Sequence, residues 1–166
     1  LHLLRGAGRG RAEPSTVVCS AAVRACERCQ RWSFASLLLG ESQCMALRSD
    51  TVVFTNTMCA LEEGREWAQT LTLLSRMQTM RLPSDRRSYD AAISACSRTG
   101  ALQAALRLYG VVQRQRIRPD IPTYNPLIYA CSRALRWDHA WALCGSMQNS
   151  FIQPSAVTYT ALLDAA

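Results

Sequence analysis

The chain has 166 residues, of which 49% are hydrophobic, and a formal net charge of +7. This composition excludes a disordered tail, and no apolar run approaches the roughly 18 residues that a membrane span requires. The longest candidate, Leu37–Leu39, ends at Gly40, so we expect a protein without a membrane partner.

An internal period of 35 residues runs through the chain. Asp50, Asp85, Asp120 and Ser155 stand 35 residues apart, and placing each at the end of a unit defines repeats 16–50, 51–85, 86–120 and 121–155. Residues 1–15 fit the end of a preceding repeat, a reading that we prefer to an arginine-rich transit peptide. Residues 156–166 fit the first helix of a following repeat. We therefore expect a fragment of a longer array.

Several columns of this register keep one kind of residue. The fourth column is mostly aromatic, the tenth is all alanine, and the seventeenth is tryptophan or leucine. These columns contain, respectively, Cys19, Phe54, Tyr89, Tyr124 and Tyr159; Ala25, Ala60, Ala95, Ala130 and Ala165; and Trp32, Trp67, Leu102 and Trp137. The alanines allow two helices to approach closely, and the larger residues fill the space beside them.

Each unit is predicted to form two helices. A break is expected near Gly64 and at Thr99-Gly100, and the end of the second helix in 86–120 at Arg118-Pro119-Asp120, because proline disfavours helix in the residue before it. That helix places Leu102, Ala105, Leu106 and Tyr109 on one side. One helix pair cannot bury its apolar face alone, so neighbouring pairs must stack into an all-α solenoid.

The first helix of repeat 121–155 shows the helical period most clearly. Its inward positions are predicted to be Tyr124, Leu127, Ile128 and Cys131. Thr123 is the predicted cap, and Pro126 is placed in the first turn, where a missing N–H costs little.

Charge and cysteine usage give weaker indications. All 19 basic residues are arginine, and seven crowd one stretch: Arg86, Arg87, Arg98, Arg107, Arg114, Arg116 and Arg118. Arginine suits phosphate and base recognition, although a GC-rich genome explains its use equally well.

Cys26, Cys96 and Cys131 share the eleventh column, where cysteine serves as a small apolar residue, which favours a reducing compartment. Cys26 and Cys29 form a lone pair without further ligands, so we expect no metal, no cofactor and no catalysis.

The residues of the repeats resemble the pentatricopeptide repeat family. The stretches that carry the resemblance are 121–128 (IPTYNPLI), 89–96 (YDAAISAC) and the unit ends 117–120 (IRPD) and 152–155 (IQPS). The resemblance implies a right-handed superhelical solenoid that binds single-stranded RNA at one base per repeat. The first two complete repeats match the family pattern less well.

The resemblance also implies which residues read a base. In the family, the fifth and last residues of a repeat contact the base edge. The candidate pairs here are Ser20 with Asp50, Thr55 with Asp85, Asp90 with Asp120, and Asn125 with Ser155, and Thr160 begins a fifth pair. Family preferences imply a purine for the first pair, guanine for the second and a pyrimidine for the fourth. The Asp90/Asp120 pair matches no common reader and is expected to be silent.

Two further columns complete the expected site. The second residue sandwiches bases in the family, and the thirteenth often faces phosphates. The former are here Val17, Val52, Arg87, Pro122 and Val157, and the latter Arg28, Arg98 and Arg133, with Glu63 breaking the row. Each residue type also has an ordinary structural use in helix caps and turns.

Two functions remain open at this stage. The first is a sequence-selective binder of single-stranded RNA in mitochondria or plastids, where family members stabilise, process, edit or help translate transcripts. The second is a structural subunit of a large organellar assembly, such as a mitochondrial ribosome, that grips protein or ribosomal RNA by shape. A base reader should expose its fifth and last residues along an open groove.

Overall fold

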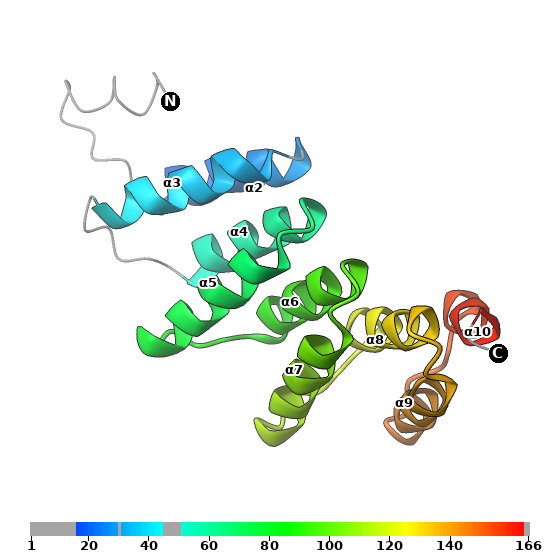
Figure 1. Cartoon of the computed structure of the whole chain (residues 1–166). Coiled ribbons are helices and arrows are strands. Elements are labelled where there is room, and N and C mark those ends of the chain that lie inside the picture. Colours follow the sequence, from blue (N-terminus) through cyan, green and yellow to red (C-terminus); the bar gives the residue numbers. More distant parts are fainter. Residues whose placement is uncertain (1–15, 30, 45–50, 165–166) are drawn as a thin grey trace, which may run out of the picture.

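The structure is a computed structural model, and it describes residues 16–29, 31–44 and 51–164. Within these ranges the chain forms helices α2 to α10 and no strand, which confirms the all-α prediction (Figure 1). The first helices of the repeats are α2 (Thr16–Arg28), α4 (Thr51–Glu63), α6 (Arg86–Arg98), α8 (Ile121–Arg133) and α10 (Ala156–Leu163). The second helices are α3 (Trp32–Cys44), α5 (Trp67–Thr79), α7 (Leu102–Arg114) and α9 (Trp137–Asn149).

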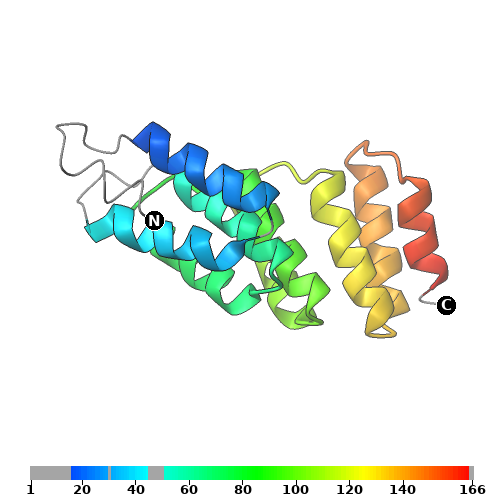
Figure 2. The same cartoon turned by 90° about the horizontal axis from the view of Figure 1, so that it is seen from above.

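The helices form two layers with different packing. Each first helix packs against the next first helix, and each of α3, α5, α7 and α9 contacts the first helix of its own repeat and of the following one. Across the described ranges, no Cα atom of one of these second helices lies within 8 Å of a Cα atom of another, so their backbones are spaced more widely than those of the first helices. The row therefore bends, with the first helices on its inner side (Figures 1 and 2). We call the exposed side of α2, α4, α6, α8 and α10 the inner face.

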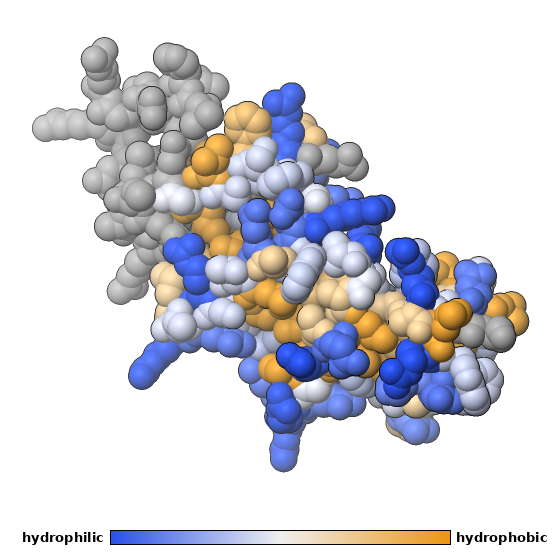
Figure 3. Space-filling view, viewed as in Figure 1, coloured by the Kyte–Doolittle hydropathy of each residue, from blue (hydrophilic) through white to orange (hydrophobic). Residues whose placement is uncertain are grey.

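The core follows the predicted columns. Phe54, Tyr89 and Tyr124 of the fourth column are at most 1% exposed, and Ala60 and Ala95 of the tenth are fully buried. Ala25 and Tyr159 are exposed and depart from the pattern. Trp67 and Trp137 of the seventeenth column are exposed too, so they do not fill the space beside the alanines as expected. The rings of Tyr89 and Tyr124 are large, so their burial accounts for much of the apolar contact between successive repeats. Figure 3 shows apolar side chains in the middle of one face, surrounded by hydrophilic ones.

The breaks expected near Gly64 and at Thr99-Gly100 are confirmed, because α4 ends at Glu63 and α6 ends at Arg98. The left-handed residue after α4 is Arg65, with φ 58°, not Gly64, and Leu135 takes the same conformation after α8. Gly100 is the only glycine among the described residues with a positive φ. Gly64 is required for another reason, because a Cβ there would lie 2.4 Å from Cδ1 of Trp32 in the preceding repeat.

The helix ends also correct three details. The cap of α8 is Asp120, and Thr123 acts as the third helical residue of a capping box. Pro126 is the sixth residue of α8 and therefore lies beyond its first turn. Helix α7 ends at Arg114, before the expected Arg118-Pro119-Asp120 signal, because Arg116 turns the chain with φ 56°.

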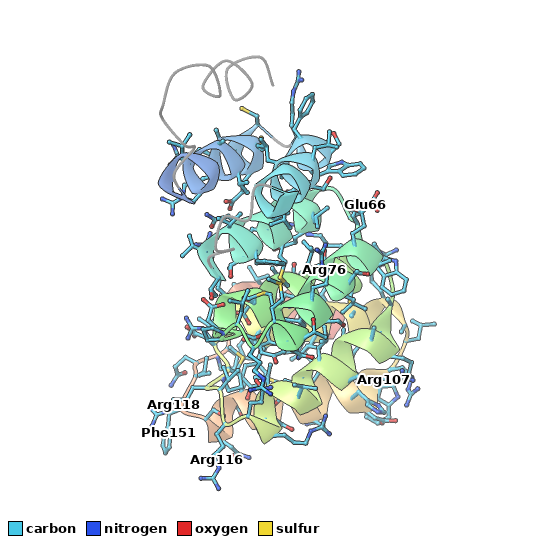
Figure 4. All side chains as sticks on the ribbon, turned by 90° about the vertical axis from the view of Figure 1, so that its left-hand side faces the viewer. Glu66, Arg76, Arg107, Arg116, Arg118 and Phe151 are labelled. Atoms are coloured by element: carbon cyan, nitrogen blue, oxygen red, sulfur yellow. The ribbon has the colours of Figure 1, made fainter. Side chains whose placement is uncertain are left out.

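The arginines that crowd one stretch of the sequence do not form one patch. Figure 4 shows Arg116 and Arg118 projecting beside Phe151 at one edge, while Arg107 projects at the other side. Cys96 and Cys131 are fully buried, and burial raises the pKa of the Cys96 thiol to about 11. Among the helices described, none is long and apolar enough to cross a membrane.

Candidate functional site

The predicted site columns lie on first helices or at the loops that precede them. Of the second column, Val52 is 49% and Val157 66% exposed, and Arg87 and Pro122 are also exposed. The side chain of Val17 and the whole of Asp50 lie outside the described residues. The exposed side chains of Val52 on α4 and Val157 on α10 are available to a ligand.

The fifth and last residues of repeat 121–155 are joined by a hydroxyl from the next repeat. Thr158 Oγ1 donates to Asn125 Oδ1 at 2.8 Å, and it lies 3.1 Å from the backbone nitrogen of Ser155, which donates to it. The hydroxyl oxygens of Ser155 and Thr158 are 3.2 Å apart. Ser155 also caps α10, so the pair is held by the start of the following helix.

The same connection recurs in repeat 86–120, with added charge. Thr123 donates its hydroxyl to Asp90 Oδ1 and accepts a bond from the backbone nitrogen of Asp120. The Arg86 side chain lies between the two carboxylates, with Nη1 3.2 Å from Asp120 Oδ2 and Nε 3.7 Å from Asp90 Oδ2. Burial raises the pKa of Asp90, although Thr123 and Arg86 act in the opposite direction.

In repeat 51–85 the connecting hydroxyl belongs to Ser88. Its Oγ lies 2.9 Å from Thr55 Oγ1 and donates to Asp85 Oδ1 at 2.6 Å. Thr55 is only 4% exposed, whereas Asp85 is exposed. This pair therefore presents mainly its last residue to solvent.

Repeat 16–50 lacks such a hydroxyl. The residue that corresponds to Ser88, Thr123 and Thr158 is Val53, which is 3% exposed. Ser20 lies on α2 and, with Arg28, lines a cavity of about 390 Å³. The resemblance did not point to this third column, although a hydroxyl recurs in the sequence at residues 88, 123 and 158.

Two of the three arginines expected to face phosphates, Arg98 and Arg133, contact other side chains of the protein. Arg98 Nη1 lies 3.4 Å from Glu63 Oε2 of the preceding repeat. Arg133 places its guanidinium 5.9 Å from the centre of the exposed Tyr129 ring, a cation–π contact. Arg28 is exposed on α2.

Arg87, which was expected to sandwich a base, also contacts another side chain of the protein. Arg87 Nη2 lies 3.6 Å from Glu27 Oε1, so its side chain reaches across α4 from α6 to α2. The pair is more than a third exposed at Arg87, and such pairs hold only weakly. Arg87 is therefore shared between Glu27 and any ligand.

A third acidic residue, Glu62, lies between these pairs. Burial raises its pKa above the usual range, while a hydrogen bond with Ser94 and the nearby Arg98 guanidinium lower it. Glu27 and Glu62 share the twelfth column, where the next two repeats have Ser97 and Ser132.

A groove of about 710 Å³ brings several predicted residues together. It runs between α6, α8 and α10, and Asn125, Val157, Thr160 and Arg98 line it. Tyr129, which was not among the residues predicted from the sequence, lines it as well. Base-edge, sandwich and phosphate candidates thus meet in one open groove.

Comparisons with known proteins support the repeat assignment. A model described as the PPR repeat family matches residues 119–166, and one described as a pentatricopeptide repeat domain matches residues 72–133. No curated protein sequence matches the chain.

Solved structures share the fold. The pentatricopeptide repeat protein PPR10 from maize is 18% identical, with a TM-score of 0.80 over 95% of this chain and 22% of that one. PPR10 in complex with an 18-nt psaJ RNA element is 24% identical, with a TM-score of 0.79 over 91% of this chain and 22% of that one. The PPR domain of Arabidopsis thaliana protein-only RNase P 1, in complex with tRNA, is 12% identical, with a TM-score of 0.78 over 87% of this chain and 77% of that one. The chain thus spans 22% of the length of PPR10.

Proposed function

Because the chain belongs to the pentatricopeptide repeat family, we propose that it binds single-stranded RNA along its inner face and acts in organellar RNA metabolism. The observation that carries the proposal is the groove in which Asn125, Val157, Thr160 and Arg98 meet. PPR10 and the PPR domain of protein-only RNase P 1 were each solved with RNA, which supports the same class of ligand here.

In the proposed complex each base lies between second-column residues and meets a fifth-and-last pair. Val52 and Val157 supply exposed apolar surface for the base faces. Stacking contributes about 1–3 kcal/mol per base, so the few repeats of this chain hold RNA without selecting one transcript. The proposed role is binding, in a mitochondrion or plastid, where free thiols such as that of the buried Cys96 suit a reducing environment.

A second candidate function is a scaffold inside a ribonucleoprotein assembly. The ion pairs Glu27–Arg87 and Glu63–Arg98 favour it, because they withdraw two arginines from the inner face. The Arg86 bridge between Asp90 and Asp120 favours it for the same reason. In that role, the surface contacts protein or folded RNA by shape.

Selection from pools of short single-stranded RNA separates the two functions. Base reading is expected to enrich guanine and, two bases on, a pyrimidine, and Thr55→Ala and Asn125→Ala should each remove one preference. Gln103→Ala, which changes an exposed residue of the second helix α7, is the control and should leave both unchanged. Binding that depends on salt but shows no preferred sequence would favour the scaffold.

A further inference from the structure

The hydroxyl groups of Ser88, Thr123 and Thr158 connect the fifth and last residues of each preceding repeat. We name these three the bridging hydroxyls. Each belongs to the third column of its repeat, is fully buried, and reaches a side chain 33 residues earlier in the chain. A buried hydroxyl has one proton to donate and two lone pairs to accept with, so its partners determine the direction of every bond around it.

The direction is settled at Thr158. Its oxygen accepts from the backbone N–H of Ser155, and Ser155 is also its hydroxyl neighbour at 3.2 Å. The Thr158 proton goes to Asn125 Oδ1, so the proton between the two hydroxyls must come from Ser155. Both lone pairs of Thr158 are then occupied, and an amide N–H of Asn125 has nothing to donate to there. Because Oδ1 of Asn125 is turned to Thr158, its NH₂ donors are left for the groove that Asn125 lines.

The direction is opposite at Ser88. Its single proton goes to Asp85 Oδ1, so Thr55 must donate its own proton to Ser88 Oγ. The Thr55 hydroxyl oxygen then has only its lone pairs left, so it can act towards a ligand only as an acceptor. The two repeats therefore offer opposite polarities at the fifth position, although threonine and asparagine each have both a donor and an acceptor.

Resting on the proposed function, we infer that Ser88 and Thr158 are positioning residues that set whether the fifth residue of the preceding repeat acts as acceptor or donor towards a base. Thr55 and Asp85 then offer only acceptors, most of them on the exposed Asp85 carboxylate because Thr55 is 4% exposed, so this pair requires a base edge with donors, as guanine N1–H and N2–H₂ provide. Asn125 requires an edge with acceptors, as a pyrimidine provides. Each base is thus read by three residues, one of which belongs to the next repeat.

At Thr123 the same bond has a different result. Thr123 donates to Asp90 Oδ1, while Arg86 Nε lies 3.7 Å from Asp90 Oδ2. Both oxygens of Asp90 have partners, and Asp120 is bridged by the same arginine. Both carboxylates of this pair are engaged with the same Arg86 side chain, so repeat 86–120 is expected to accept all four bases.

The test is RNA selection with the intact protein and two variants that each remove one bridging hydroxyl, at one fixed salt concentration. Thr158→Val should weaken the pyrimidine preference by about 3- to 10-fold, the range of a single hydrogen bond, and leave the guanine preference intact. Ser88→Ala should do the reverse. Each variant therefore serves as the control for the other.

Two further variants separate positioning from stability. Thr158→Ser keeps the hydroxyl and should keep the pyrimidine preference. Thr57→Val removes a fully buried hydroxyl that bonds only within α4, to the carbonyl of Val53, and should change neither preference. Thermal unfolding of all four variants confirms that each is folded at the selection temperature.

Three results would overturn the inference. If Thr158→Val and Ser88→Ala both retain the wild-type preferences, the bridging hydroxyls have no positioning role, and RNA reading by the fifth and last residues stands without them. If Thr158→Ser loses the preference as Thr158→Val does, the hydroxyl is not the active group. If the wild-type protein binds RNA with no base preference, both this inference and the base-reading function fail together.

Discussion

The N-terminal half of the inner face, on α2 and α4, differs in charge from the C-terminal half, on α6, α8 and α10. The N-terminal half carries Glu27, Glu62 and Glu63, and the corresponding columns of the C-terminal half contain Ser97, Ser132 and arginine. Its third column is valine, where the C-terminal half has the bridging hydroxyls. Both halves contain buried members of the aromatic and alanine columns: Phe54 and Ala60 in the N-terminal half, and Tyr89, Tyr124, Ala95 and Ala130 in the C-terminal half. The residues that pack the helices together are therefore different from those that would attract a negatively charged ligand such as RNA.

The largest expected effect concerns how the first repeat is held. Gly64→Ala should lower the free energy of unfolding by about 1–3 kcal/mol, because the new Cβ would overlap the Trp32 ring. Gly110→Ala in α7 is the matched control, since nothing lies within 4 Å of its Cβ, and it should be neutral or stabilising. Chemical denaturation measures both. Equal stability of Gly64→Ala and wild type would show that Trp32 moves aside and that this contact does not hold the first repeat against the second.

A second variant removes a defect in the N-terminal half. The Nδ2 atom of Asn56 is buried without a hydrogen-bond partner among the described residues, whereas the same column has Ala91 and Ala161 in the C-terminal half. Asn56→Ala should raise the free energy of unfolding by about 1 kcal/mol, because it removes an unpaired buried amide. Asn56→Asp is the opposing control and should be destabilising, because it buries a charge. A loss of stability in Asn56→Ala would indicate that packing by the amide matters more than its missing bond.

A third variant makes the two halves more alike in charge. Glu63→Gln releases Arg98, whose Nη1 lies 3.4 Å from the carboxylate. Affinity for single-stranded RNA should rise about two- to fivefold at low salt and converge with wild type at high salt. Asp138→Asn removes the same charge from the exposed start of α9 and is the control. An equal rise in both variants would point to net charge and not to Arg98.

The smallest expected effect is a pH dependence at Glu62. The groups that face it are Ser94, Arg98, Glu63 and Asp90, and burial raises its pKa in the folded protein. The folded state thus binds this proton more tightly than the unfolded chain, so the associated stability is present at low pH and is lost as pH rises through the folded pKa. Glu62→Gln should be more stable than wild type at neutral pH, and the difference should shrink on acidification.

Thermal unfolding between about pH 7 and about pH 5 measures this difference. Glu66→Gln, in which an acidic residue just before α5 is changed, is the control. A difference between Glu62→Gln and wild type that does not change with pH would assign the effect to packing.

The stacked helices were predictable because their signals are local or periodic. Burial of Phe54, Tyr89 and Tyr124 follows from a helical period repeated every 35 residues. The turn residues were missed because Arg65 and Leu135 adopt a conformation that sequence reasoning reserves for glycine. Surrounding contacts must compensate for that cost, and these are not visible in a single repeat.

The sequence predicted which columns of the repeat form the candidate site, but it did not predict which side chains these residues contact. Asn125, Val157 and Thr160 do meet in one groove. The bridging hydroxyls and the Arg87–Glu27 pair depend instead on the distance and angle between successive repeats, which the packing of whole helices sets. The burial of Thr55 has the same origin.

The wider backbone spacing of α3, α5, α7 and α9 in the described chain has a mechanical consequence. Resistance to bending is concentrated in the layer of first helices, while the outer ends can spread or close with little loss of contact. The array should therefore bend easily on the side of the second helices and little on the side of the first helices. The spacing of its repeats can then adjust to the spacing of the bound ligand. Small rotations at each repeat add up along the row, so a longer array would change its length without unfolding any unit.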